Sequence, residues 1–366
     1  MFTAWKRMLI IALLCVCCVS ACAETLEPLD MDSYDCGPAP RDEAYTFSDP
    51  DDQDGSDSLK QYYKKYSEKN AEVKGFDLCT GYEDESISVK LYHGTYGKTD
   101  YVYAHVKISD PSQLRTASGN GPFTNNSNAT AKGSKMAANV NAVLAINGDY
   151  YTKPDKCQVV MRQGKQVRNR ADGTKDLLVI DRQGNFTALP ESPRDAGSYA
   201  LDPQRNYYVS PGCTAAKYKE YLQEHQNEMY QVFCFGPVLV QNGVSVISED
   251  YRNGYVGSHN LAQRTAIAQL GPLEYMVIAC NGPQSSPKGD MGLTLYEFAS
   301  ICETAGKQLS ENGCLLAYNM DGGNSAQMIF KALDTKKGAL RYVKVSSPDI
   351  GERQLSDILY FATLVK

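Results

Sequence analysis

The sequence is poor in several residues that mark familiar kinds of protein site. Tryptophan occurs once, at Trp5, and the four histidines show no metal-ligand spacing. None of the eight cysteines after residue 22 belongs to a C-x-x-C pair, which argues against a zinc ribbon and a thioredoxin-like redox motif. A G-x-S-x-G elbow, which presents a nucleophilic serine, is also missing.

The chain also lacks the excess of positive charge that nucleic-acid binders carry. Its 37 Lys and Arg residues against 43 Asp and Glu residues give a formal net charge of −6. We therefore expect no nucleic-acid partner. The chain is 42% hydrophobic and 22% charged, as ordinary globular proteins are, which excludes a collagen-like, coiled-coil or mostly disordered protein.

An apolar run near the N-terminus predicts export. The basic pair Lys6-Arg7 precedes the apolar run Met8–Val19, which is the pattern of a signal peptide. The run ends in Val19-Ser20-Ala21-Cys22, which resembles a bacterial lipobox, so we expect a signal peptide over residues 1–21 and a lipid anchor on Cys22. Cleavage after Ala23 and an uncleaved anchor are the alternatives. All three predict an extracytoplasmic protein, and the first predicts attachment to the membrane.

The remaining cysteines allow two interpretations. They are Cys36, Cys79, Cys157, Cys213, Cys234, Cys280, Cys302 and Cys314. An even count in an exported chain favours disulfides, although the sequence gives no connectivity. Alternatively, several are small buried apolar residues, which we favour for Cys280 because it ends the apolar run Tyr275–Cys280.

Residues 24–60 are strongly acidic. They contain 12 Asp and Glu residues against two basic ones, Arg41 and Lys60, and few apolar residues. Such a stretch buries too little surface to offset the entropy of ordering it. We therefore predict an acidic stalk over residues 22–84 and one folded domain over residues 85–366. Ser58–Lys69 has some helical character and could belong to either part.

The domain has many strand patterns and few helical ones. Strands and hairpins are predicted at Ile87–Tyr92, Tyr101–Val106, Lys175–Ala188, Val238–Gly243, Arg264–Cys280, Leu315–Tyr318, Gln327–Phe330, Leu340–Val345 and Ile358–Val365. Helical spacing appears at Thr214–Tyr230 and at Leu293–Gln308, where Thr294 is a fair N-cap. This mixture predicts an α+β fold, with a mixed, largely antiparallel sheet core and a few packed helices.

The first polar cluster follows a buried-looking strand. Ala145-Ile146 runs into Asn147-Gly148-Asp149-Tyr150, so a turn presents an amide and a carboxylate. Gly148 permits backbone angles that other residues avoid. A plain Asn-Gly turn is the alternative interpretation.

The second polar cluster, Asn319–Ser325, has the sequence Asn-Met-Asp-Gly-Gly-Asn-Ser after another strand. Adjacent glycines let backbone N–H groups approach an anion closely. Asp321 could serve as base, nucleophile or metal ligand, and Ser325 as a hydrogen-bond donor. The alternative is a hairpin turn. Because the lysine of a Walker A loop is missing, nucleoside triphosphate binding is not indicated.

Two arginines complete the set of candidate residues. Arg264 opens a predicted strand, and Arg353 lies in a polar loop before the last strand. A guanidinium matches phosphate oxygens in a bidentate manner. A lone arginine is more often solvated or ion-paired, so the two matter for function only if the fold brings them beside Asp321.

Several short segments follow one another in a fixed order along the chain. They are Ala145–Gly148, Phe235-Gly236-Pro237 with Asn242-Gly243, Arg264–Ala266, Gly292–Leu295 with Glu297, Asn319–Gly323 with Ser325, and Arg353 with Ser356-Asp357. In that order they resemble the phosphodiester glycosidase family, and the resemblance covers roughly residues 85–366. The chain departs from the family at Asn281-Gly282-Pro283, where Asp-Gly-Arg is frequent, and at Asp149-Tyr150, where many members have Gly-Phe.

The resemblance implies cleavage of a sugar-1-phosphodiester such as an N-acetylglucosamine-1-phosphodiester on a glycan or cell-envelope polymer. A phosphodiester leaves as a stable anion, so it needs cationic and N–H donors more than the second carboxyl group of ordinary glycosidases. The expected site comprises Asp321 as base or nucleophile, Arg264, Arg353, Gly322 and Gly323 around the phosphate, Asn147 and Ser325 around the sugar, Asp149 as a reserve carboxylate, and Gly236 at the substrate.

No cofactor and no metal site is expected. A phosphodiesterase that breaks the P–O bond would normally need two clamping metal ions, and the sequence offers no suited cluster of Asp and His. The main alternative to an enzyme is a surface lipoprotein that binds a glycan or cell-wall polymer without cleaving it. The missing Asp-Gly-Arg arginine favours that alternative.

Overall fold

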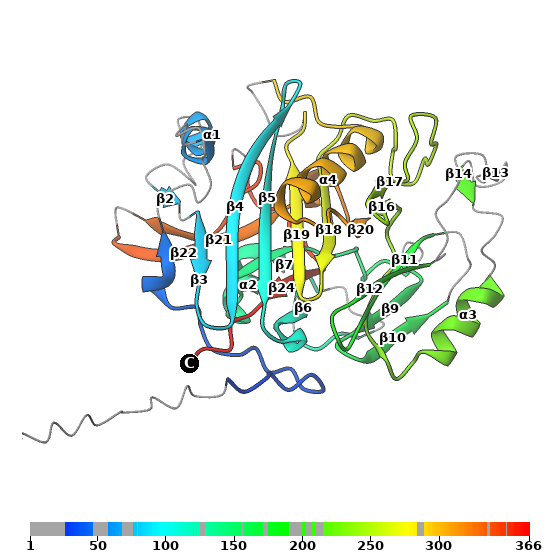
Figure 1. The fold of residues 1–366 in the computed structure, drawn as a ribbon, viewed down its shortest axis with the longest axis horizontal. Coiled ribbons are helices and arrows are strands. Elements are labelled where there is room, and N and C mark those ends of the chain that lie inside the picture. Colours follow the sequence, from blue (N-terminus) through cyan, green and yellow to red (C-terminus); the bar gives the residue numbers. More distant parts are fainter. Residues whose placement is uncertain are drawn as a thin grey trace, which may run out of the picture.

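Antiparallel sheets form most of the fold, as the computed structural model in Figure 1 shows. It describes residues 26–46, 58–67, 76–78, 80–119, 121–124, 129–154, 157–170, 175–189, 200–202, 207–209, 215–283, 289–334, 337–348 and 350–366. The expected signal peptide and Cys22 lie outside these ranges. The predicted α+β class is confirmed.

The largest sheet has nine strands in the order β1-β3-β4-β5-β19-β18-β20-β16-β17. Their bounds are Tyr45–Thr46 (β1), Gly81–Glu83 (β3), Ile87–Tyr96 (β4), Thr99–Ile108 (β5), Glu274–Cys280 (β19), Arg264–Gly271 (β18), Leu316–Asn319 (β20), Val238–Gln241 (β16) and Val244–Ser245 (β17). Every pairing is antiparallel. Two hairpins predicted from the sequence, β18–β19 and β16–β17, are confirmed.

Helix α4 (Leu295–Leu309) covers one face of this sheet (Figure 1). Thr294 caps it reciprocally with Glu297, as the sequence predicted for Thr294. The helix buries Phe298, Ala299 and Cys302 against the sheet, because these residues recur at helical spacing on one side.

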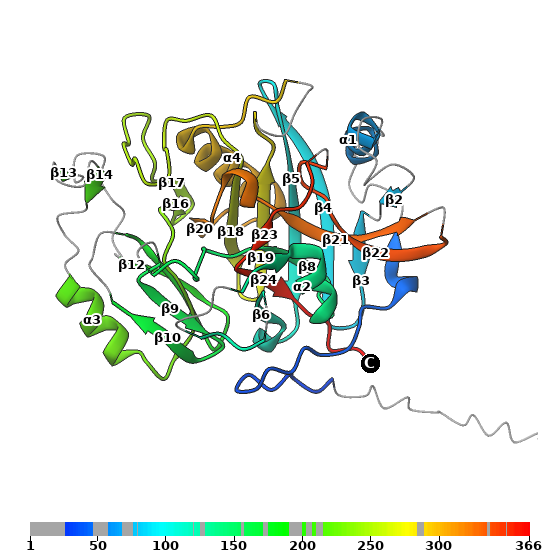
Figure 2. The ribbon, with the colours of Figure 1, turned by 180° about the vertical axis from the view of Figure 1, so that it is seen from behind.

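A six-stranded sheet packs behind the first, as Figure 2 shows from the other side. It consists of β2 (Phe76–Leu78), β21 (Met328–Asp334), β8 (Leu144–Asn147), β24 (Asp357–Phe361) and β6 (Leu114–Ser118), with β22 (Ala339–Lys344) paired to β21. Helix α2 (Gly133–Asn139) lies on it. Ile267 and Val277 of the first sheet share one core with Ile146 and Leu359 of this sheet. The main core therefore lies between the two sheets.

A third sheet of five strands lies beside these two. Its order is β10 (Lys165–Asn169), β9 (Val159–Arg162), β15 (Met229–Phe233), β11 (Leu177–Asp181) and β12 (Phe186–Leu189). The remaining short elements are β13 (Ala200–Asp202), β14 (Tyr207–Val209), β7 (Ala131–Lys132), β23 (Gln354–Leu355), η1 (Asp42–Ala44), η2 (Pro111–Gln113) and η3 (Gly323–Ser325).

The helical pattern predicted to run to Tyr230 ends earlier. Helix α3 covers Ala215–Glu224, and the chain then turns into strand β15. Residues Met229–Phe233 are fully buried between β9 and β11, so the requirements of the sheet overrode the local helical spacing.

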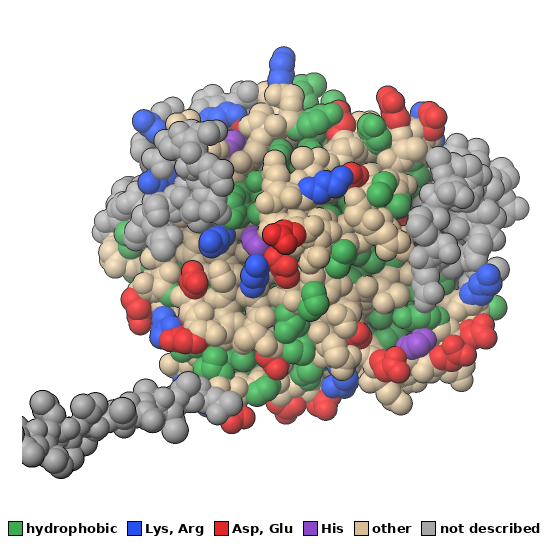
Figure 3. Space-filling model, in the orientation of Figure 1, with side chains coloured by type: hydrophobic (Ala, Val, Ile, Leu, Met, Phe, Trp, Pro, Cys, Tyr) green, Lys and Arg blue, Asp and Glu red, His purple; other side chains and the backbone are tan. Residues whose placement is uncertain are grey.

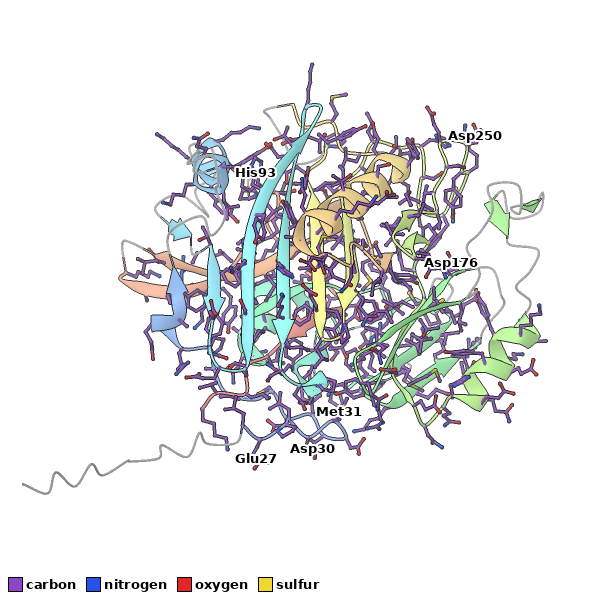
Figure 4. All side chains as sticks on the ribbon, in the orientation of Figure 1. Glu27, Asp30, Met31, His93, Asp176 and Asp250 are labelled. Carbon is purple, nitrogen blue, oxygen red and sulfur yellow. The ribbon has the colours of Figure 1, made fainter. Side chains whose placement is uncertain are left out.

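The prediction of a stalk over residues 22–84 is wrong for its described part. Leu29 is buried, and its N–H donates to Ser112 Oγ at 2.9 Å. Tyr45 packs against Tyr82 and Phe330 in the main core. The acidic composition concealed a few apolar and aromatic anchors at wide spacing, and these anchors are enough to hold the segment on the domain. Figure 4 shows Glu27, Asp30 and Met31 of this segment along the lower edge of the molecule.

Helix α1 (Ser58–Ser67) is also docked, against β4. Its Tyr66 hydroxyl donates to the Asp100 carboxylate at 2.8 Å and contacts Asp290, and both Tyr62 and Tyr66 are buried. Among the described residues, no helix is long and apolar enough to cross a membrane.

Candidate functional site

The two predicted Asn/Asp clusters meet where β8 and β20 end. The Asn147 amide donates from Nδ2 to the Asp321 carbonyl at 2.7 Å, and its Oδ1 accepts from the Gln327 N–H at 3.0 Å. The Asp321 N–H in turn donates to the Gly148 carbonyl at 3.3 Å. Asn147 is 1% exposed, so its side chain fastens the two loops together rather than facing a ligand.

Asp321 is the partly exposed carboxylate of this junction. Burial raises its pKa to about 6, and the nearby charge of Asp149 acts in the same direction. Ser325, Arg353 and the Gly322 N–H oppose that rise because they stabilise the carboxylate. A carboxyl with such a pKa is ionised at neutral pH and still basic enough to accept a proton.

The glycine pair after Asp321 allows a close approach between chain segments. The Gly323 N–H donates to the Gln263 carbonyl at 2.9 Å, and its φ of +59° suits glycine. A Cβ at Gly322 would lie 2.8 Å from the same carbonyl. The Gly323 N–H is therefore engaged, while the Gly322 N–H points to the Asp321 carboxylate.

Beneath Asp321 lies a buried cluster that the sequence analysis missed. Arg162, at the end of β9, places Nη2 2.6 Å from Asp149 Oδ1 and 3.0 Å from Asp357 Oδ2. All three side chains are at most 1% exposed. The only sequence signal was an arginine that directly follows the apolar run Val159–Met161.

The two carboxylates of this cluster, Asp149 and Asp357, differ in the hydrogen bonds of their second oxygens. The second oxygen of Asp149 accepts the Cys234 N–H at 2.8 Å. Asp357 Oδ1 is buried and has no hydrogen-bond partner among the described residues. Burial raises the pKa of Asp357 to about 7; Arg162 opposes the rise, and the charges of Asp149 and Asp321 add to it. Two carboxyl groups thus share one buried guanidinium, with the charge of Asp321 nearby, which favours retention of a proton among the three carboxyl groups.

Gly148 makes room for Asp357, and this leads to a prediction. A Cβ at Gly148 would lie 2.3 Å from Asp357 Oδ1, so Gly148→Ala forces that carboxyl to move. We expect a loss of about 1–3 kcal/mol in the free energy of unfolding, measured by urea denaturation. The same substitution in an Asp357→Ala background should cost much less, because the clashing atoms are gone. Equal costs in both backgrounds would contradict this account.

Of the two predicted arginines, Arg353 lies beside Asp321 and Arg264 does not. Arg353 is exposed, its Nη2 donates to the Tyr150 hydroxyl at 3.1 Å, and its charge lowers the pKa of Asp321. Tyr150 has a φ of +72°, an uncommon conformation for a tyrosine, at the position where many family members have Phe. Arg353 and Tyr150 therefore border Asp321 at the surface.

The side chain of Arg264 points to a neighbouring loop instead of toward Asp321. Its side chain donates at 2.8 Å to each of the carbonyls of Val256, Gly257 and Asn260, and at 3.1 Å to that of Leu293. It is 3% exposed, and burial lowers its pKa to about 10. The guanidinium fastens the loop around Gly257, so we leave it out of the proposed phosphate site.

That loop brings Tyr255 to the other side of the site. Its hydroxyl is buried with no hydrogen-bond partner among the described residues, and its ring lies 3.8 Å from Lys175 Nζ. Burial raises the pKa of Tyr255, and the charge of Asp321 adds to the rise. Tyr255 lies in a loop without a periodic pattern, and Lys175 opens a predicted hairpin, so neither residue carried a sequence signal for a site.

Gly236 shapes the backbone beside Lys175. It has a φ of +70°, and its carbonyl accepts from Asn319 Nδ2 at 2.8 Å. A Cβ there would lie 3.3 Å from Asp176, which Figure 4 labels near β11 and β16. The carboxylate of Asp176 accepts the Val238 N–H at 2.9 Å. The structure therefore gives Gly236 a conformational role next to the site.

The segment Asn281-Gly282-Pro283, which departs from the family pattern, is buried at its first two residues and exposed at Pro283. Asn281 is fully buried, and its Oδ1 accepts from the Ser347 N–H at 2.9 Å and from the Tyr62 hydroxyl of α1 at 3.2 Å. Asn281 thus binds protein groups where many relatives carry the aspartate of Asp-Gly-Arg.

Metal and disulfide chemistry find no support in the described ranges. They contain no group of three or more His, Cys, Asp or Glu that could hold a metal ion. The described cysteines that are unpaired are Cys36, Cys157, Cys234, Cys280, Cys302 and Cys314. Cys280 is fully buried beside α4, as expected, while Cys79 and Cys213 lie outside the described residues.

Solved structures of other proteins are similar to this chain. The zebrafish N-acetylglucosamine-1-phosphodiester alpha-N-acetylglucosaminidase catalytic domain, auto-inhibited by its pro-peptide, matches with a TM-score of 0.52 and 14% identity, over 77% of this chain and 85% of that one. A hypothetical protein from Synechocystis matches with a TM-score of 0.41 and 15% identity, over 75% of this chain and 62% of that one. No curated protein matches.

The zebrafish structure shares the fold. The model of the phosphodiester glycosidase family matches residues 140–362, more than half of the chain, and this range includes every site residue described above. The chain therefore belongs to the phosphodiester glycosidase family.

Proposed function

We propose that the protein hydrolyses a sugar-1-phosphodiester, such as an N-acetylglucosamine-1-phosphodiester, on a glycan or cell-envelope polymer. The observation that carries the proposal is Asp321, a partly exposed residue whose carboxyl group has a pKa raised by burial and lies between the cation Arg353 and a buried carboxylate cluster. Family membership supports a glycosidase, and the site residues support this bond.

Asp321 acts at the anomeric carbon, as general base or as nucleophile. As a base it takes a proton from water while the water oxygen attacks the carbon. As a nucleophile it forms a glycosyl ester that water then hydrolyses. In both cases the bond from the carbon to the phosphate oxygen breaks, and its electron pair leaves on that oxygen. Inversion of the anomeric centre would indicate the base, and retention would indicate the nucleophile.

The phosphate is held by groups on both sides of Asp321. Arg353 supplies a guanidinium at the surface, and Lys175 supplies an ammonium beside the Tyr255 ring. The Tyr255 hydroxyl stays protonated because its pKa is raised, so it can donate to a phosphate oxygen. Ser325 is 1% exposed, so its hydroxyl acts on the Asp321 carboxylate rather than on the sugar. Asn147 and the Asp149–Arg162–Asp357 cluster position Asp321 from below.

We place this reaction outside the cytoplasm. The signal-peptide pattern of residues 1–21 and the lipobox-like segment ending at Cys22 support export and a lipid anchor. A substrate on a cell-envelope polymer would be within reach of such a protein.

The test is a panel of sugar-1-phosphodiesters, with release of free sugar as the measurement. We expect wild-type turnover, and ¹⁸O from labelled water in the sugar rather than in the phosphate. Arg353→Gln and Lys175→Met should each lower kcat/KM about tenfold to a hundredfold, because each removes a charge-assisted hydrogen bond. The exposed Lys219→Met on α3 is the matched control.

Two outcomes would contradict the proposal. Label in the phosphate would indicate P–O cleavage instead. No turnover of any diester, together with measurable binding of a cell-wall polymer, would indicate the non-catalytic binder.

A further inference from the structure

A pocket opens where the β4–β5 hairpin meets the start of α4. Its volume is about 280 Å³, at the small end of the range of about 300–1,000 Å³ that is common for ligand sites. Tyr96, Tyr251 and Tyr296 contribute to its wall, with Glu249, Ser258 and His259. None of these residues belongs to the site around Asp321.

Two of the tyrosines are unusually exposed. Tyr96 is 43% and Tyr296 is 41% accessible to solvent, and Leu261 and Met291, exposed to a similar degree, belong to the same end of the first sheet. In Figure 3 hydrophobic side chains gather at the upper edge, over the end of the β4–β5 hairpin. An exposed aromatic ring beside a pocket offers a flat apolar face together with a hydroxyl, which suits the apolar face and hydroxyl groups of a sugar ring.

The charges around the pocket oppose an anionic ligand. Its lining contains two carboxylates, Glu249 and Glu297, and His259 is its one basic side chain among the described lining residues. Burial and the neighbouring charge of Arg252 lower the pKa of His259, so its ring is neutral at pH 7. A phosphate would meet net negative charge here, whereas a neutral sugar would meet hydrogen-bonding groups.

One loop links this pocket to the catalytic site. Residues 251–260 supply Tyr251, Ser258 and His259 to the pocket and Tyr255 to the surroundings of Asp321. Arg264 holds the loop through the carbonyls of Val256, Gly257 and Asn260. A glycan seated in the pocket would therefore contact the same loop as the phosphodiester.

We propose that this pocket is an ancillary subsite for one neutral pyranose unit, which stacks on Tyr96 and Tyr296. The link between this sugar and the glycan that carries the cleaved diester rests on the proposed function. The binding of a neutral sugar in the pocket is independent of that function.

The test is titration calorimetry with neutral trisaccharides built from glucose, galactose, mannose, N-acetylglucosamine or N-acetylgalactosamine. These probes carry no phosphodiester, so they report binding without turnover. We expect at least one to bind the wild type. Tyr96→Ala and Tyr296→Ala should each weaken binding of that probe roughly threefold to tenfold or more, and Tyr296→Phe should keep most of it because the ring remains.

Tyr34→Ala is the matched control, because Tyr34 is 46% exposed on the N-terminal segment. Thermal melts of each variant verify folding. Absence of binding by every trisaccharide, or equal binding by wild type and both alanine variants, would overturn the proposal. If diesters are not cleaved but binding depends on Tyr96 and Tyr296, the proposed function fails and the subsite stands.

Discussion

We expect Asp321→Asn to lower the rate of sugar release by on the order of a hundred- to ten-thousand-fold, while the protein remains folded. The amide keeps the shape of the side chain and the backbone contacts of the loop, but it can neither accept a proton nor attack a carbon. The measurement is kcat/KM for a sugar-1-phosphodiester, beside the exposed Glu220→Gln of α3 as control. A wild-type rate for Asp321→Asn would exclude the proposed role.

The pKa of Asp321 adds two pH-dependent results. Because only the ionised carboxylate is active, kcat/KM should fall tenfold per pH unit below about pH 6. The raised pKa means that the folded state binds this proton more tightly than the unfolded state does. The protonated Asp321 therefore contributes to the stability of the folded state at low pH. This contribution is lost as the pH rises from about 4 to about 6. Asp321→Asn, which stays neutral, should gain on the order of 1–2 kcal/mol over the wild type at pH 7.

Removal of the Arg162 charge should have the largest effect on stability. Arg162→Met leaves Asp149 and Asp357 buried without their counter-ion, and such a loss typically costs about 3–5 kcal/mol. The side chain also packs its guanidinium 4.1 Å from the ring centroid of Phe233 and donates to the Val232 carbonyl at 2.6 Å. We expect a clear drop in the urea midpoint, and a loss of activity wherever Asp321 is displaced.

A triple variant separates charge from packing. Arg162→Met combined with Asp149→Asn and Asp357→Asn buries no ionised group, so it should recover a substantial part of the lost stability. A single Arg162→Met variant with an unchanged midpoint would show that the cluster does not hold these loops.

The sequence predicted the parts of the fold whose signal is local. The β18–β19 hairpin and helix α4 follow from alternation, helical spacing and the cap at Thr294. The end of α3 was misplaced because Met229–Phe233 are committed to the centre of a sheet, which local spacing does not reveal. The stalk was wrong because average composition hides sparse anchors such as Leu29 and Tyr45.

The site residues that directly follow a strand could be predicted from the sequence. Asn147 and Asp321 were expected together, and Asn147 Nδ2 indeed lies 2.7 Å from the Asp321 carbonyl. Which face a side chain occupies was not predictable for Arg264, since one residue of register decides it. Arg162 comes from a third sheet and Lys175 from the loop before strand β11 of that sheet, and the packing of this sheet against the other two leaves no trace in either local sequence.

For a molecule anchored at Cys22, as proposed, the docked N-terminal segment limits the distance between the domain and the membrane. Three residues lie between the proposed anchor Cys22 and Leu26, the first described residue, and the four fully extended Cα–Cα steps that join the two span at most roughly 14 Å. Figure 1 draws this segment along the lower edge and the end of the β4–β5 hairpin at the upper edge, and Tyr96 of that hairpin lines the pocket. A lipid-anchored molecule would thus rest its lower edge on the headgroups and present the sugar-binding end outward. In that orientation a polymer would reach the site only from the side that faces away from the membrane. Polymer chains that lie flat on the lipid surface would not be cleaved.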